Sequence, residues 1–170
     1  MKNILIVVDM QNDFIDGSLG TKEAVAILPN VARKINEYRQ RGDKIIFTAD
    51  THFDNYLDTN EGKHLPVKHC IKGTDGWKIS PKLDVGDSKI IEKPTFGYLE
   101  WKNEIENVDG LSIELIGLCT DICVVSNALI LKATFPSATI KVDSTCCAGV
   151  TPSSHTSALT TMQMCQIEVM

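Results

Sequence analysis

The sequence predicts a single α/β domain with three layers: a doubly wound sheet of about six parallel strands with helices on both faces. Two observations lead to this prediction. Short apolar runs alternate with segments of helical periodicity along the whole chain, and the first run, residues 4–8, is continuously apolar, as in a strand buried on both faces. The chain has 170 residues, of which 43% are hydrophobic, so we expect residues 1–170 to share one core.

The predicted elements follow the order that a parallel sheet requires. Pro29 is expected to begin a helix with an apolar stripe, and Gly42 is expected to end it. The strands after the first are predicted over residues 44–49, 88–92, 111–117, 138–142 and 166–169. Further helices are predicted over residues 98–107, 122–133 and 151–164, the last with Thr151 at its N-cap and Pro152 in its first turn. Residues 50–87 show little regular pattern, and such long segments are usually functional.

Charge and hydropathy exclude two classes of partner. The formal net charge is -5 and lysines and arginines form no cluster, so no binding to nucleic acid is expected. No apolar stretch approaches the length of a membrane span, and the N-terminal apolar run is too short for a signal peptide. We therefore expect a soluble, cytoplasmic protein without a membrane partner. Its six cysteines should then be reduced, and the absence of a Cys-x-x-Cys pair argues against a structural zinc module.

Four residues with useful chemistry follow the predicted strands. Asp9, Asp50 and Lys93 end the first three strands, and Cys123 comes after the fourth, where a helix is expected to begin. Because the carboxyl ends of parallel strands share one edge of the sheet, we expect the four side chains to converge. The positive end of a helix stabilises a thiolate, so the pKa of Cys123 is expected below its usual value of about 8.5. Backbone N–H groups of Cys119 and Cys123 could hold an oxyanion.

These residue types suggest acyl transfer through a thioester. A buried carboxylate such as Asp9 can accept the proton of a nucleophilic thiol, and Lys93 can keep that carboxylate ionised or pair with the thiolate. Each residue alone has an ordinary explanation, since Asp9 could be a turn or cap residue and Lys93, before Pro94, a solvated loop lysine. Their joint placement with Cys123 favours the hydrolysis of an amide.

The irregular segment 50–87 contains three of the four histidines and several carboxylates. Its candidate metal ligands are Asp50, His52, Glu61, His64 and His69. Asp50 and His52 lie two apart in an extended stretch and therefore project to the same side. Two imidazoles with carboxylates suit Zn²⁺, Fe²⁺ or Mn²⁺ better than Ca²⁺ or Mg²⁺, and an incomplete protein shell leaves positions for water or substrate. A polar loop with surface histidines is the alternative, which the residues alone predict about equally.

Three segments resemble the signature segments of the isochorismatase-like cysteine hydrolases. They are Val-Asp-Met-Gln-Asn-Asp-Phe at residues 8–14, Glu-Lys-Pro-Thr-Phe-Gly at 92–97 and Gly-Leu-Cys-Thr-Asp-Ile-Cys-Val at 117–124. The resemblance covers nearly the whole chain and is specific for the superfamily, not for a substrate. It implies a catalytic triad of Asp9, Lys93 and Cys123. It also implies an oxyanion hole at the amides of Cys119 and Cys123, and a cis peptide bond between Leu118 and Cys119.

Within the superfamily, the chain resembles the nicotinamidases, which carry a metal beside the triad. Asp50-Thr51-His52 is similar to their metal motif, and His69 is similar to their last histidine ligand. The intervening ligand is His or Glu among nicotinamidases, so Glu61 is expected here, with His64 as the alternative. Phe14 is similar to an aromatic residue of the nicotinamide pocket. The resemblance thus implies one divalent metal ion, zinc ahead of iron or manganese, on Asp50, His52, Glu61 and His69, and it implies a homo-oligomer.

The expected function is hydrolysis of a small amide substrate, nicotinamide, to nicotinate and ammonia in NAD salvage, through a thioester on Cys123. One alternative keeps the triad and changes the substrate to another small amide, ureide or vinyl ether. A second alternative is a metal- or ligand-binding protein in which Cys123 is a redox-sensitive thiol. Two features depart from most nicotinamidases: the chain is shorter, and Phe53-Asp54-Asn55-Tyr56 replaces the Pro-rich sequence that they often carry.

Overall fold

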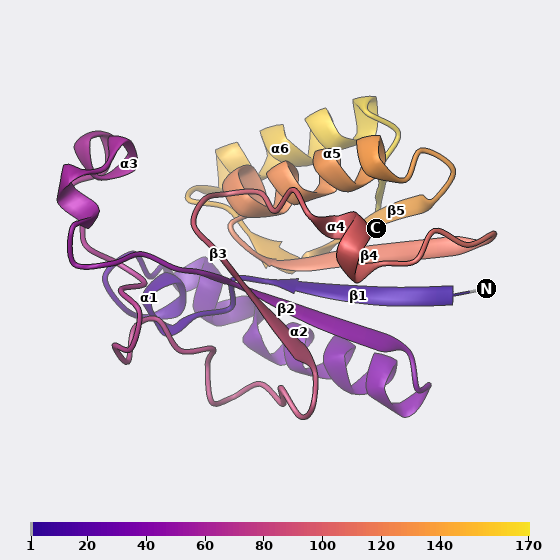
Figure 1. The fold of residues 1–170 in the computed structure, drawn as a ribbon, viewed down its shortest axis with the longest axis horizontal. Coiled ribbons are helices and arrows are strands. Elements are labelled where there is room, and N and C mark those ends of the chain that lie inside the picture. The colour runs from indigo at the N-terminus through magenta and orange to yellow at the C-terminus, as the bar shows by residue number, and fades with distance from the viewer. Residues whose placement is uncertain (1) are drawn as a thin grey trace.

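A parallel six-stranded sheet forms the centre of the computed structural model, which describes residues 2–170 (Figure 1). The strand order is β3-β2-β1-β4-β5-β6, and every neighbouring pair is parallel. The chain winds outward from β1 to one edge, then returns to the centre and winds outward to the other edge. This order confirms the predicted doubly wound α/β class. The strands are β1 (Lys2–Val8), β2 (Lys44–Asp50), β3 (Lys89–Lys93), β4 (Leu111–Leu118), β5 (Thr139–Ala148) and β6 (Glu168–Val169).

Helices cover both faces of the sheet. In Figure 1, α2 lies on one side of the sheet, and α5 and α6 lie on the other. β1 supplies both cores by alternation: Leu5 and Val7 pack on the α2 side, whereas Ile4, Ile6 and Val8 pack on the α5 and α6 side. The helices are α1 (Asn12–Ile15), α2 (Lys22–Gln40), α3 (Asn60–His64), α4 (Trp101–Glu104), α5 (Val125–Thr134) and α6 (Pro152–Met164). No helix within residues 2–170 combines the length and the apolar character that crossing a membrane requires.

The start of α2 differs from the prediction. The helix begins at Lys22, and Pro29 lies inside it instead of opening it. Thr21 is the N-cap, because its side-chain oxygen accepts a hydrogen bond from the N–H of Ala24. Pro29 has no N–H to donate within the helix, but the apolar stripe continues on both sides of it. Burial of that stripe offsets one missing hydrogen bond.

Other helices and strands also begin or end at residues that differ from the predicted ones. The helix predicted over residues 98–107 is only the single turn α4, and β5 extends beyond the predicted residues 138–142. Within residues 50–87, the regular structure is a 3-10 turn, η1 (Tyr56–Asp58), and the short helix α3. A π-helical turn, η2 (Thr120–Val124), links β4 to α5 and carries Cys123. Wider π turns are frequent at functional sites.

Gly117 lets the central strands approach closely at their carboxyl ends. Its φ is +117°, and a Cβ atom at this position would collide with the carbonyl oxygen of Val8 on the neighbouring strand. Only glycine meets both conditions without strain. The residues that follow β1 and β4, Asp9 and Cys119, are therefore brought to the same edge of the sheet.

Candidate active site

Three of the predicted residues form one buried group at the carboxyl edge of the sheet. The Nζ atom of Lys93, at the end of β3, lies 2.6 Å from Oδ2 of Asp9 and 3.5 Å from Sγ of Cys123. Asp9 and Lys93 are fully buried, and Cys123 is 4% exposed. A lysine in such a place is held by its partners rather than by water, which rules out the reading of Lys93 as a solvated loop residue.

Asp9 is oriented by a neighbour that the sequence did not indicate. Its backbone has a φ of +46°, and its Oδ1 accepts a hydrogen bond of 2.6 Å from the hydroxyl of Thr48, a fully buried residue of β2. The backbone N–H of Asp9 donates to the carbonyl of Thr48 at 3.2 Å. These contacts direct the other carboxylate oxygen toward Lys93.

The electrostatics of this group favour a protonated thiol in the resting site. Burial raises the pKa of Cys123, the negative charge of Asp9 adds to the effect, and the opposing influence of Lys93 is smaller. Burial alone would lower the pKa of Lys93, but Asp9, Cys123 and Asp50 raise it above its ordinary value, so Lys93 is an ammonium. The predicted lowering of the thiol pKa is therefore wrong here, because the buried turn η2 stands beside two carboxylates.

The surroundings of Asp9 make its carboxylate a better proton acceptor. Burial raises the pKa of its carboxyl, while the Lys93 ammonium acts in the opposite direction. A carboxylate whose pKa lies above its ordinary value is a stronger base than a solvated aspartate. The arrangement can therefore move a proton from the Cys123 thiol to Asp9 with Lys93 balancing the charge.

The four predicted metal ligands lie together beside this group. One donor atom from each of Asp50, His52, Glu61 and His69 can be chosen so that all four lie within 4.8 Å of one another. The Nε2 atom of His52 is 2.9 Å from Oδ2 of Asp50 and 3.6 Å from Oε1 of Glu61. The Nε2 atom of His69 lies 3.6 Å and 3.7 Å from the same two oxygens. His64 is not part of this group, since it is exposed and its Nδ1 contacts the carbonyl of Asn60.

The donors fit a divalent cation. Nδ1 of His69 lies 2.8 Å from the carbonyl oxygen of Val67, so donation there leaves Nε2 free to face the cluster. Although burial alone would raise the pKa of Asp50, hydrogen bonds from His52 and His69 lower it, so this carboxylate is ionised. Burial raises the pKa of Glu61, and the charge of Asp50 adds to that rise. The buried carboxylate of Asp50 and the half-buried carboxylate of Glu61, with two imidazoles, make a site whose negative charge a divalent cation would neutralise.

Residues directly after Asp9 hold the metal-ligand segment in place. The side chain of Gln11 accepts from the N–H of Asp50 and donates to its carbonyl, each at 2.8 Å. Oδ2 of Asp13 accepts from the N–H of Cys70, next to His69, at 2.8 Å. Sequence reasoning gave neither residue a role, although both lie in the signature segment 8–14.

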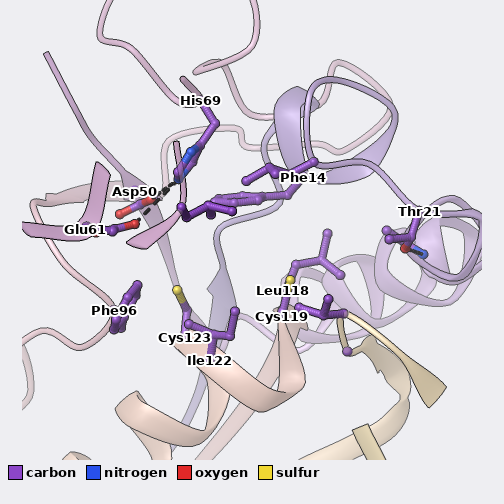
Figure 2. A pocket seen from close by; sticks show the side chains of 15 residues that line it. Phe14, Thr21, Asp50, Glu61, His69, Phe96, Leu118, Cys119, Ile122 and Cys123 are labelled. Atoms are coloured by element: carbon purple, nitrogen blue, oxygen red, sulfur yellow. Dashed lines mark hydrogen bonds and ion pairs between the residues drawn. The ribbon is translucent and has the colours of Figure 1, made fainter. Parts of the chain in front are cut away.

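A cavity of about 250 Å³ joins the thiol to the metal-ligand group. Figure 2 shows Asp50, Glu61 and His69 on one wall, with the sulfur of Cys123 pointing toward them from η2. The predicted pocket residue Phe14 lines the cavity, and its ring centre lies 5.5 Å from that of His69. The volume is below the range of about 300–1,000 Å³ that is typical of drug-sized ligands, so the cavity suits a small molecule.

The turn that leads to Cys123 has the expected backbone. The peptide bond between Leu118 and Cys119 is cis, and the side chains of Leu118, Cys119 and Ile122 line the cavity. The carbonyl of Cys119 accepts from the N–H groups of Ile122 and Val124. Burial raises the pKa of Cys119 to about 12, and it was not predicted as a nucleophile.

The chain is similar to known proteins over its whole length. The family model of the isochorismatase domain matches residues 3–170. The nicotinamidase/pyrazinamidase of Mycobacterium tuberculosis is 27% identical, covering 97% of this chain and 96% of that protein. A probable inactive nicotinamidase of Arabidopsis thaliana is 29% identical, covering 94% of this chain and 87% of that protein. The crystal structure of the pyrazinamidase/nicotinamidase from Streptococcus mutans superposes with a TM-score of 0.85 at 26% identity, covering 99% of this chain and 100% of that chain.

Proposed function

The chain belongs to the isochorismatase family, and on that premise we propose that it is a metal-containing cysteine amidohydrolase that converts nicotinamide and water to nicotinate and ammonia. One observation carries the proposal. The Nζ atom of Lys93 lies 2.6 Å from Asp9, 3.5 Å from Cys123 and 3.7 Å from Oδ1 of Asp50, so the thiol, the base and the metal-ligand group form one cluster. Cys123 and three of the metal-ligand residues in this cluster line the cavity. Since a relative that matches 94% of this chain is described as a probable inactive nicotinamidase, this complete site supports activity better than overall identity does.

The residues of the site suggest a two-step acyl transfer. Asp9 takes the proton of the Cys123 thiol while Sγ attacks the carboxamide carbon, and the amides of Cys119 and Cys123 receive the developing oxyanion. Asp9 then returns the proton to the departing ammonia as the carbon–nitrogen bond breaks, which leaves a thioester on Cys123. Asp9 next takes a proton from water as the oxygen attacks the thioester, and the intermediate collapses to nicotinic acid and the Cys123 thiolate. The thiolate regains the proton from Asp9, and the new carboxyl group loses its proton to solvent, which gives nicotinate.

A metal ion fits this proposal without changing the proton path. Asp50, His52, Glu61 and His69 would hold it, and we propose zinc because two imidazoles and two carboxylates suit that ion. When bound, the ion would act as a Lewis acid toward an electron-pair donor of the substrate, such as a ring nitrogen. Phe14, packed against His69, would contact the face of the ring.

The cavity favours a neutral amide over an anionic vinyl ether. Within residues 2–170, the side chains that line the cavity include the carboxylates of Asp50 and Glu61 but no lysine or arginine. With the cation in place the two carboxylates would be neutralised, and the lining would then offer a substrate's own carboxylates no lysine or arginine to pair with, whereas an uncharged ring with a carboxamide needs no such partner. The remaining lining is mostly apolar, as expected for a small aromatic ligand.

The wider setting of the enzyme also belongs to this proposal. We propose one domain over residues 1–170, a cytoplasmic location, a part in NAD salvage and no binding to nucleic acid or membrane, supported by the net charge of -5 and the thiol-dependent site. A homo-oligomer is also part of the proposal, and it rests on the resemblance to the nicotinamidases.

Ammonia release by the purified protein tests the proposal. We expect release from nicotinamide that is lost after chelation and returns with zinc. We also expect Cys123→Ala to abolish turnover while nicotinamide still binds. A vinyl ether dianion and an aliphatic amide of similar size serve as comparison substrates. Ready hydrolysis by Cys123→Ala, or faster turnover of the dianion than of nicotinamide, would contradict the proposal.

A further inference from the structure

Asn127 is a fully buried amide in the first turn of α5, and all of its polar atoms are engaged. Its Nδ2 group donates to the carbonyl of Cys123 at 2.8 Å and to the carbonyl of Phe96 at 3.1 Å. Its Oδ1 atom accepts from the N–H of Tyr98 at 2.9 Å and from the indole N–H of Trp101 at 3.2 Å. One side chain therefore holds η2 on one side and the segment after β3 on the other.

These contacts close a ring around the nucleophile. From Cys123, the ring passes through Sγ to the Lys93 ammonium, and from Lys93 to the carbonyl of Thr95 at 3.1 Å. The neighbouring carbonyl of Phe96 accepts from Asn127, which returns to Cys123 through its second N–H. The separation of the thiol from Lys93 is thus held through Asn127 as well as through the two side chains themselves.

Packing at Gly97 supports the same connection independently. A Cβ atom at Gly97 would collide with Cδ1 of Ile130, and Ser126 lies next to the same point. The segment between Lys93 and Tyr98 therefore rests directly on α5. Phe96, which this segment carries, is also a wall of the cavity. A change at Asn127 would act on the nucleophile and on the cavity wall together.

We propose that Asn127 is a positioning residue of the active site, which sets the placement of Cys123 relative to Lys93 and holds Phe96 at the cavity. Nothing in its contacts gives it a chemical step, since it touches Cys123 only through the backbone carbonyl. The proposal rests on the proposed amidase function for its kinetic consequences. Its structural consequence, the reactivity of Cys123, is independent of any substrate.

The paired variants Asn127→Thr and Asn127→Val separate the contact of Asn127 with Cys123 from its contact with Phe96. The two side chains have nearly equal volume, and a helical threonine can donate to the carbonyl four residues earlier, which is that of Cys123. Both variants lose the contact with Phe96. The measurements are kcat and KM for nicotinamide, and the rate of Cys123 alkylation by iodoacetamide at one pH. Peptide mass spectrometry distinguishes Cys123 from Cys119 and from the exposed Cys165.

We expect Asn127→Val to lower kcat and the alkylation rate about tenfold, and Asn127→Thr to keep both within about threefold. Asn127→Thr should still raise KM severalfold through the loss of the Phe96 contact. Asn36→Val, at an exposed position of α2, controls for valine within a helix and should change neither. If Asn127→Val does not fold, the smaller pair Asn127→Ser and Asn127→Ala replaces it.

The outcomes distinguish this inference from the proposed function. Equal alkylation rates in the threonine and valine variants, or faster alkylation in the valine variant, would overturn the positioning role. Slower alkylation in the valine variant than in the threonine variant, in a protein that releases no ammonia from nicotinamide, would uphold the positioning role and reject the proposed function. Ammonia release from nicotinamide, with equal alkylation rates in the two variants, would uphold the proposed function and reject the positioning role.

Discussion

Replacing Thr48 by valine removes the hydroxyl that donates to Oδ1 of Asp9 at 2.6 Å, with almost no change in side-chain volume. Both residues are fully buried, so water cannot take over the lost hydrogen bond. A buried hydrogen bond to a charged group contributes about 1.5–3 kcal/mol, and we expect the free energy of unfolding to fall by that amount. For a domain of this size the melting temperature should fall by roughly 3–12 °C.

The same substitution should move the pH dependence of activity in one direction. Burial already raises the pKa of Asp9, and the Thr48 hydrogen bond opposes that rise by stabilising the ionised form. Without it the pKa rises further, so Asp9 stays protonated to higher pH and cannot accept the thiol proton there. The acid limb of the kcat/KM profile should therefore move to higher pH.

Urea unfolding and a pH profile of ammonia release measure the two effects. Thr139→Val is the matched control, because Thr139 pairs with Ser112 near the amino ends of the strands, at the opposite edge from Asp9. The control should keep the pH profile of the unchanged protein. A Thr48→Val variant with the stability and the acid limb of the original protein would refute the role given to Thr48 and, with it, the role of Asp9 as the base.

Two further predictions concern the metal-ligand group and a buried ion pair. Glu61→Gln should weaken zinc binding by at least about tenfold in calorimetry, whereas His64→Ala should leave it unchanged; the reverse order would make His64 the ligand. Asp143 lies 2.8 Å from the Lys34 ammonium, and although burial alone would raise its pKa, Lys34 and Thr145 lower it below the ordinary 3.8. Its contribution to stability is thus present above pH 3.8 and lost as pH falls through the lower folded value. Asp143→Asn should lower the free energy of unfolding at neutral pH by about 1–3 kcal/mol and flatten its decline in acid, and an unchanged acid decline would contradict this.

The convergence at the sheet edge could be predicted because topology alone requires it. Strand patterns placed Asp9, Asp50 and Lys93 at the ends of parallel strands, and parallel strands end at one edge. The choice of Glu61 over His64 came from the resemblance, and the structure places Glu61, not His64, within the cluster. Here local pattern and global fold agree, which is why the sequence was informative.

Features that depend on tertiary contacts could not be predicted from a single sequence. The raised pKa of the Cys123 thiol follows from burial beside Asp9, and burial outweighs the stabilisation expected from a helix start. Thr48 and Asn127 act across 39 and 31 positions of sequence, to Asp9 and Phe96, and neither lies in a signature segment. Pro29 was misplaced because burial of a continuous apolar stripe outweighs the loss of one hydrogen bond.

The most direct test of the central claim is intact-protein mass spectrometry of the zinc-loaded enzyme, quenched with acid during turnover of nicotinamide. We predict a species heavier than the free protein by one nicotinoyl group, with the added mass on the peptide that contains Cys123. The same species should be absent from Cys123→Ala and should disappear as substrate is exhausted. Sustained ammonia release without any acyl-protein, or an acyl group on Cys119 instead, would contradict a thioester mechanism at Cys123.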